Sequence, residues 1–184
     1  MPAEGCETVF QPPAPAGGFF LQAAIFANGE YLPPEGIDEQ LAASELIIAA
    51  DGGARYALAV GSTPDVLIGD LDSLDANIRA ELDSSKVIQH PIDKDSSDLE
   101  LALLHAKEAG ADKGLVFAGL GRRWDHSLAN LLLPLNADLA SLEVVFWHGD
   151  QCLFIIHDQV DLDAPVGARV SLLPVAGDAE GVET

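Results

Sequence analysis

The chain has 184 residues, and its 30 Asp and Glu against 9 Lys and Arg give a formal net charge of -21. This charge disfavours binding to nucleic-acid phosphates and to anionic membrane surfaces, and no apolar run reaches the ~18 residues of a membrane span. The length fits one domain, or one domain with a small appendage. Cys6 and Cys152 are too few for a disulfide framework or a C-x-x-C metal site, so a reducing, cytoplasmic location is expected.

Residues 1–18 are rich in Pro, Ala and Gly, which predicts a loose N-terminal tail. Beyond them, short apolar runs alternate with stretches of helical period. The predicted strands are Phe20–Ala27, Leu46–Ala50, Val66–Ile68, Val87–Gln89, Leu115–Ala118 and Leu142–Trp147. The predicted helices are Ala54–Val60, Asn77–Leu82, Leu99–Ala109 and Leu128–Leu135. Because most runs are apolar at consecutive positions, residues 19–148 are predicted to form an α/β domain, a mostly parallel, Rossmann-like sheet with helices on both faces.

The pattern changes after residue 148. Cys152–Ile156 and Arg169–Leu173 look like strands, and the stretch between them carries Pro165 and Gly167 and has no helical period. Residues 149–184 are therefore predicted to begin a small antiparallel β domain. Two or three strands are marginal alone, so this unit must rest on the first domain or a partner chain, or be incomplete.

Polar residues follow each of the first five apolar runs. The carboxyl ends of parallel strands meet at one edge of a sheet, where ligands bind, so these residues are expected to lie together. The segments concerned are Asn28-Gly29, Asp51-Gly52-Gly53, Gly69–Ser73, Asp93–Asp98 and Gly119–His126.

Asp70-x-Asp72 is the first candidate metal site. In extended chain, residues i and i+2 point the same way, so both carboxylates can reach one cation, and Mg²⁺ typically takes one or two carboxylates plus substrate phosphates. The alternative is a solvated turn in which Asp72 or Ser73 caps the next helix.

The second acidic segment precedes a predicted helix. Ser97 and Glu100 match a capping box and are expected to be structural. A cap needs one acid, and this turn has three, so Asp95 and Asp98 are predicted to bind metal or substrate.

Glycine and arginine supply the rest of the site. Gly52 and Gly53 follow Asp51 and are able to adopt positive φ and to let a ligand approach backbone N–H groups. Neither a Walker A loop nor G-x-G-x-x-G occurs in the chain, so a nucleotide must be held by other means. Arg122 and Arg123 suit bidentate phosphate contacts, with ion pairing to nearby acids as the alternative. From the residues alone, the site is a magnesium-dependent one that handles a polyphosphate.

These segments resemble the thiamine pyrophosphokinase (thiamine diphosphokinase) family. Its pattern runs DGG, then P-D-x-x-x-G-D-x-D-S, then D-x-[ST]-D, then G-x-x-G-G-R-x-D-H-x-x-x-N. Four blocks match in order, within about residues 24–133: Asp51–Gly53, Pro64–Ser73, Asp95–Asp98 and Arg123–Asn130.

The resemblance implies transfer of pyrophosphate from ATP to the hydroxyl of thiamine, with release of AMP and with Mg²⁺ as cofactor. It implies a homodimer whose small-molecule substrates are ATP and thiamine. The implied metal ligands are Asp70, Asp72 and Asp98, with Asp51 supporting them. The implied nucleotide or phosphate contacts are Asp51, Gly52, Ser73, Arg123, Asp125 and Asn130, and Asp95 activates or orients the hydroxyl.

Two departures from the family pattern stand out. Arg122 replaces the second glycine of G-G-R, and Gly181-Val182-Glu183-Thr184 resembles only the beginning of the G-V-T-T-x-G-L segment of the family's C-terminal β-sandwich, so the chain is expected to be truncated. Two other functions remain open: a magnesium-dependent phosphohydrolase built on Asp70-x-Asp72, and a non-catalytic module that binds nucleotide or thiamine.

Overall fold

A computed structural model describes residues 20–69, 78, 82, 85–89, 96–162, 164, 166–175 and 177–183. All described helices and strands lie in one compact unit that ends at Gln159. The strands are β1 (Gln22–Phe26), β2 (Leu46–Ala50), β3 (Val66–Gly69), β4 (Lys86–Gln89), β5 (Lys113–Phe117), β6 (Glu143–His148) and β7 (Gln151–Phe154). The α-helices are α1 (Ile37–Ala42), α2 (Ala54–Ala59), α4 (Asp98–Glu108) and α5 (Trp124–Leu132). The 3-10 turns are η1 (Asp51–Gly53), η2 (Leu133–Leu135) and η3 (Ala137–Leu139).

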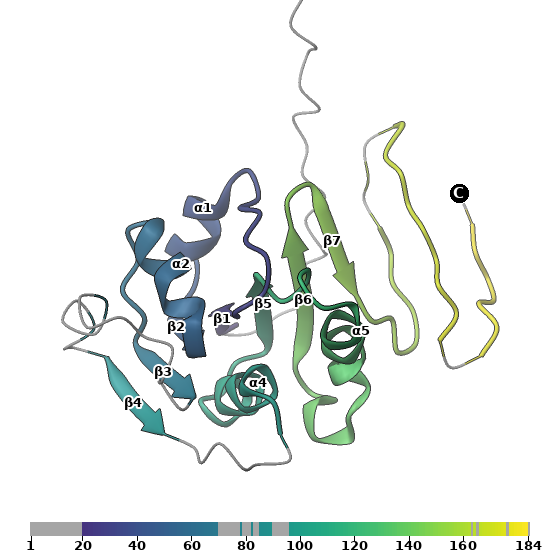
Figure 1. Cartoon of the computed structure of the whole chain (residues 1–184). Helices are drawn as coiled ribbons and strands as arrows, with labels where there is room; N and C mark the ends of the chain where they lie inside the picture. The colour runs from purple at the N-terminus through teal and green to yellow at the C-terminus, as the bar shows by residue number, and fades with distance from the viewer. Residues whose placement is uncertain are drawn as a thin grey trace, which may run out of the picture. The chain divides into compact units, whose positions relative to one another are not determined.

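The seven strands form one sheet in the order β4-β3-β2-β1-β5-β6-β7 (Figure 1). Neighbours from β4 to β6 are parallel, and only β7 runs antiparallel, against β6. All six strands predicted in residues 19–148 are present, and the prediction of a mostly parallel α/β fold is confirmed.

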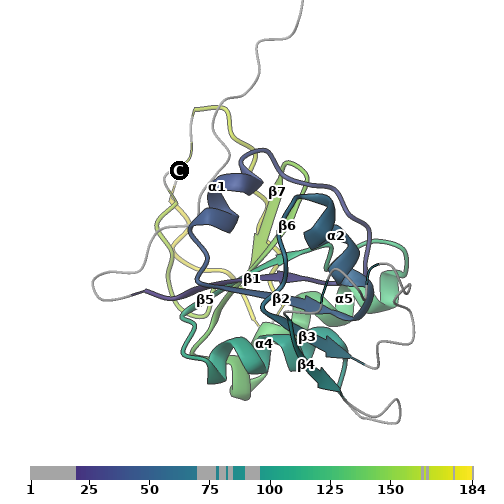
Figure 2. The same ribbon diagram turned by 90° about the vertical axis from the view of Figure 1, so that its left-hand side faces the viewer.

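Each face of the sheet has its own apolar core. On one face, alternate β1 residues such as Ala23 and Ile25 pack with Leu99 and Leu103 of α4. On the other, Ala49 and Leu67 pack with Ala54 of α2. Figure 2 shows α4 on the opposite side of the sheet from α1 and α2. This double coverage explains why every residue of β1 and β5 is buried and why the runs lack polar alternation.

The predicted helix Asn77–Leu82 lies almost entirely outside the described residues. The described helices differ from the sequence prediction in two places. Helix α1 was not predicted, because Ile37 is its only buried residue and it has no apolar period. The last predicted helix begins four residues earlier, at Trp124, and gives way to a 3-10 turn that contains Pro134, whose ring disfavours a continuing α-helix.

The C-terminal segment also differs from its prediction. Gln151–Phe154, predicted to open a second domain, instead forms β7, which pairs with β6 across a turn at Gly149 (φ 60°). Among the described residues beyond Phe154 there is no helix or strand, and residues 169–173, predicted as a strand, have irregular backbone. A separate β domain in residues 149–184 stays a prediction. None of the described helices is long and apolar enough to cross a bilayer.

Cys152 lies on β7 and gives a prediction about reactivity. Burial raises the pKa of its thiol to about 11, against a smaller opposing effect of Lys113. Only the thiolate reacts with alkylating agents, and each pKa unit changes its concentration tenfold below the pKa. We expect Cys152 to react with iodoacetamide at pH 8 about 100-fold more slowly in the native protein than in denaturant. Mass spectrometry of the peptide that contains it measures both rates, and equal rates would contradict the burial.

Candidate functional site

The loops after β1 and β5 run side by side at the carboxyl-terminal edge of the sheet. The amide of Ala27 donates to the Phe117 carbonyl at 2.9 Å, that of Gly29 to Ala118 at 2.7 Å, and that of Glu30 to Leu120 at 2.7 Å. A Cβ on Gly29 would lie 2.4 Å from the Leu120 carbonyl oxygen, so only glycine permits this approach. The predicted convergence of loops is confirmed for these two segments.

Residues with strained backbone conformations cluster at the same edge of the sheet. Three described residues other than glycine have left-handed backbone: Asp51 (φ 47°), Ala118 (φ 53°) and Arg122 (φ 60°). Asp51 directly follows β2, and the other two lie in the loop after β5. Such conformations cost about 1–3 kcal/mol each and cluster at functional sites.

Asp51 is the predicted site residue that the structure describes most fully. Its Oδ2 accepts a hydrogen bond of 2.9 Å from Asn28 Nδ2, which links the ends of β1 and β2. Gly69, the last residue of β3, packs so closely that a Cβ there would lie 3.3 Å from the Asp51 backbone. The chain therefore leaves β3 toward Asp70 from a position in contact with Asp51.

Gly52 and Gly53 do not adopt the positive φ that the sequence suggested for them. Gly53 has φ -61°, and neither glycine has positive φ. Both are buried and closely packed: a Cβ would lie 2.7 Å from Asn28 Oδ1 at Gly52 and 2.0 Å from the Phe26 carbonyl oxygen at Gly53. The left-handed residue of this motif is Asp51 itself.

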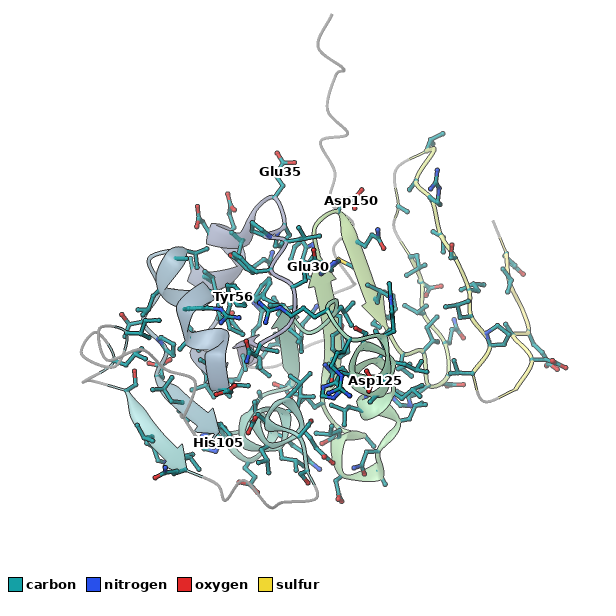
Figure 3. All side chains as sticks on the ribbon, viewed as in Figure 1. Glu30, Glu35, Tyr56, His105, Asp125 and Asp150 are labelled. Carbon is teal, nitrogen blue, oxygen red and sulfur yellow. The ribbon has the colours of Figure 1, made fainter. Side chains whose placement is uncertain are left out.

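A polar network next to Asp51 was missed by the sequence analysis. Arg55 Nη2 donates to Asn28 Oδ1 at 2.7 Å and to the Tyr56 hydroxyl at 2.9 Å. The Tyr56 hydroxyl donates to the Gly29 carbonyl at 2.9 Å. Figure 3 shows Tyr56 on α2, near the loop that carries Glu30. The one sequence signal for this network was the position of Asn28 at the end of the first apolar run, where site residues were expected.

Tyr31 extends this network with an aromatic contact. Its ring stacks on that of Tyr56, with centroids 4.7 Å apart. Its hydroxyl is buried and has no hydrogen-bond partner among the described residues. Burial, with a smaller contribution from the Asp38 carboxylate, raises the pKa of the Tyr31 phenol, so the group is neutral at physiological pH.

Arg123 and Asp125 pair with each other at the start of α5. Arg123 Nε lies 3.1 Å from Asp125 Oδ1 and Nη2 lies 2.5 Å from Oδ2, and both side chains are about two-thirds exposed. This contact lowers the pKa of the Asp125 carboxyl and raises that of Arg123. Arg123 therefore forms an ion pair in this structure, the alternative to phosphate binding given above. To bind a phosphate, Arg123 must leave Asp125 or use N–H groups that do not point to it.

Asn130 and Ser127 hold the loop after β5 against α5. Asn130 Nδ2 donates to the Gly119 carbonyl at 2.6 Å. The buried Ser127 hydroxyl accepts from the Gly121 amide at 2.9 Å and lies 3.0 Å from the Arg123 carbonyl. The sequence analysis did not select Ser127, because its role depends on a hydrogen bond with Gly121, six residues earlier in the preceding loop.

Asp98 is the first residue of α4. Ser97 caps this helix by accepting from the Glu100 amide at 3.1 Å, as predicted. Glu100 Oε1 instead accepts from Asn136 Nδ2 at 3.4 Å, which ties α4 to the segment before β6. Four of the predicted site residues, Asp70, Asp72, Ser73 and Asp95, lie outside the described residues.

The described part of the chain does not contain a complete metal site. Within it, no group of three or more His, Cys, Asp or Glu could hold a metal ion. Its possible ligands at this edge, Asp51 and Asp98, offer carboxylate oxygens, which suit a hard divalent cation. A cavity at the opposite edge, lined in part by Asp112, Glu143 and His157, contains none of the predicted site residues.

Comparison with known proteins identifies the family. Residues 37–146 match the family model described as thiamin pyrophosphokinase, catalytic domain. The chain belongs to this family. Its fold resembles that of Bacillus subtilis thiamine pyrophosphokinase, with 28% identity and a TM-score of 0.58 over 68% of this chain and 60% of that one. It also resembles the Geobacillus thermodenitrificans thiamin pyrophosphokinase, with 29% identity and a TM-score of 0.54 over 68% and 59%.

A more distant structure shares the fold alone. Yeast thiamin pyrophosphokinase has 15% identity and a TM-score of 0.58 over 72% of this chain and 60% of its own. Comparison with curated protein sequences gives no match. The chain thus spans about 60% of the length of the solved thiamin pyrophosphokinases described here.

The structure also accounts for a feature of the thiamin pyrophosphokinase pattern. The position of Arg122 is a glycine in that pattern, and its φ of 60° is one that glycine adopts without strain. In this chain an arginine occupies that backbone conformation.

Proposed function

We propose that this chain catalyses the transfer of pyrophosphate from ATP to the hydroxyl of thiamine, with magnesium as cofactor. Membership in the family carries the proposal. The arrangement of the sheet edge supports it, since the Asn28 side chain there forms hydrogen bonds with both Asp51 and Arg55. A carboxylate for a cation and a guanidinium for a phosphate are the two groups that a metal–polyphosphate substrate requires.

In this reaction the hydroxyl oxygen of thiamine forms a bond to the β-phosphorus of ATP. The bond between that phosphorus and the oxygen it shares with the α-phosphorus breaks, and AMP leaves with that oxygen. We assign Asp95 to orient the hydroxyl or accept its proton. Positioning of the alcohol in line with the phosphorus, together with charge stabilisation, should supply most of the rate enhancement.

Asp70, Asp72 and Asp98 are the residues that we expect to hold magnesium, with Asp51 supporting them. Their carboxylates are the hard oxygen ligands that magnesium prefers. The packing of Gly69 against Asp51 supports this grouping for Asp70. Bound magnesium would neutralise charge on the phosphate oxygens. Gly52, Ser73, Arg123, Asp125 and Asn130 complete the proposed nucleotide contacts.

Product analysis tests the proposal. The purified chain is incubated with ATP, thiamine and magnesium, and nucleotides are separated by chromatography. AMP and thiamine diphosphate in equal amounts are the expected products. ADP, or inorganic phosphate formed without thiamine, would contradict pyrophosphate transfer and favour a kinase or phosphohydrolase instead. Binding of ATP without turnover would favour a binding module.

We further propose a cytoplasmic homodimer. Helix α5 supports the dimer, because Trp124, Leu128 and Leu132 are spaced by four residues and are 86%, 60% and 38% exposed. An apolar stripe of this kind is typical of a surface that another chain covers. Sedimentation of the full chain tests the dimer, and a monomer at micromolar concentration would contradict it.

A further inference from the structure

Two arginines meet at one oxygen atom on the edge of the sheet. Arg55 Nη2 and Arg122 Nη2 lie 2.9 Å and 3.4 Å from the Tyr56 hydroxyl, which donates its own proton to the Gly29 carbonyl. A phenol oxygen has one proton to donate and two lone pairs to accept with, so this hydroxyl is saturated and its orientation is fixed. The two donor nitrogens therefore lie within about 6 Å of each other, a separation at which like charges interact.

These arginines have no direct carboxylate partner in the part of the chain that the structure describes. In the whole sequence, acidic residues nevertheless outnumber basic ones by 30 to 9. Arg123, by contrast, is paired with Asp125. Two adjacent cations repel each other, and an anion between them removes that repulsion.

The fold holds the Arg55 guanidinium in place and constrains the backbone that carries Arg122. Arg55 lies over the Tyr56 ring, 4.6 Å from its centroid, and its Nη2 also binds Asn28. Arg122 is exposed, but its backbone follows Gly121 (φ 85°), where a Cβ would lie 2.4 Å from Glu30 Cβ. The left-handed backbone at Arg122 is strained for an arginine and relaxed for a glycine, so the arginine lowers the stability of the fold there.

We propose that Arg55 and Arg122 form an anion-binding pair that holds the phosphate chain of the nucleotide. The proposal rests on the proposed function for the identity of the ligand. Guanidinium groups bind phosphate oxygens through paired N–H donors, which suits a polyphosphate better than a single carboxylate. The Asn28 amide joins Arg55 to Asp51, through bonds of 2.7 Å and 2.9 Å. One end of the phosphate chain thus lies against the arginines and the other toward the carboxylates.

Calorimetric titration of the full chain with inorganic tripolyphosphate, in EDTA, tests this pair without nucleotide, thiamine or metal. We expect Arg122→Gly and Arg55→Gln each to weaken binding at least fivefold, and Arg122→Lys to weaken it less than Arg122→Gly. Lys86→Gln removes one positive charge from an exposed residue at the amino-terminal end of β4, away from the edge that carries this pair, and should change binding less than twofold. Because glycine relieves the strain at φ 60°, Arg122→Gly should fold, and its thermal midpoint verifies this.

The outcomes separate this proposal from the proposed function. Binding within twofold of wild type in both Arg122→Gly and Arg55→Gln, or no tripolyphosphate binding by the wild-type chain, would overturn the pair. If the wild-type chain makes no AMP while tripolyphosphate binding depends on both arginines, the proposed function fails and the pair stands. Titration with ATP and with ADP then shows which part of the nucleotide the pair holds: loss of the arginine effect with ADP assigns it to the terminal phosphate, and an equal effect assigns it to the inner phosphates.

Discussion

Replacement of Gly53 by alanine should be the most destabilising single-methyl change at this sheet edge. The added Cβ would lie 2.0 Å from the Phe26 carbonyl oxygen and 2.9 Å from that of Ala27. Both atoms belong to the backbone at the end of β1, a strand buried on both faces, so they cannot move aside as a flexible side chain would. Overpacking of this kind costs about 3 kcal/mol, which corresponds to a fall in melting temperature of about 10 °C for a chain of this length.

Gly110→Ala is the matched control for this change. Gly110 has φ 93°, but a Cβ there would have no atom within 4 Å, so the substitution introduces backbone strain without crowding. Its cost should be about 1 kcal/mol. Thermal unfolding followed by circular dichroism measures both variants. A Gly53→Ala protein that melts no lower than Gly110→Ala would contradict the close approach of η1 and β1.

The strands and the position of the site could be predicted because burial on both faces imposes a local pattern. Leu46–Ala50 was predicted with the bounds that β2 has, since each of its positions needs an apolar side chain. The order of strand and helix then required parallel strands, whose carboxyl ends share one edge. The loops that carry Asn28 and Arg122 do meet there, through the backbone hydrogen bonds that Gly29 and Glu30 donate.

What the sequence could not predict depends on contacts between distant residues. Positive φ was one of the two uses suggested for Gly53, but it does not occur. A side chain is excluded there by the carbonyl of Phe26, 27 positions earlier, and nothing in the local sequence signals that contact. Arg55 and Arg122 are 67 positions apart in the sequence. Arg55 follows β2 and Arg122 follows β5, and these strands lie on either side of β1 in the sheet, which brings the two arginines to the same part of its edge. Residues 151–154 were assigned to another domain because antiparallel pairing to a parallel sheet leaves no mark in a four-residue strand.

Replacement of Asp51 by asparagine should separate activity from folding. Asparagine tolerates left-handed backbone better than most residues, so φ 47° adds no strain. Its side-chain oxygen can still accept the hydrogen bond from Asn28 Nδ2. The melting temperature should therefore change by no more than about 2 °C, given a cost well under 1 kcal/mol. The variant nevertheless loses one negative charge next to the end of β3, where the chain enters the proposed magnesium ligands.

We expect Asp51→Asn to lower the rate of AMP formation at least tenfold and to raise the magnesium concentration needed for half-maximal rate. A carboxylate that supports metal ligands strengthens cation binding through its charge, and loss of such a group typically costs 10–100-fold. Glu35→Gln removes one negative charge from an exposed residue outside this cluster and should leave both quantities unchanged. If Asp51→Asn shows wild-type activity and magnesium dependence, Asp51 serves only to fix Asn28. If Asp51→Asn unfolds, the charge of the Asp51 carboxylate stabilises the left-handed turn itself. The proposed magnesium site is then tested by measuring magnesium binding to the Asp70→Asn variant.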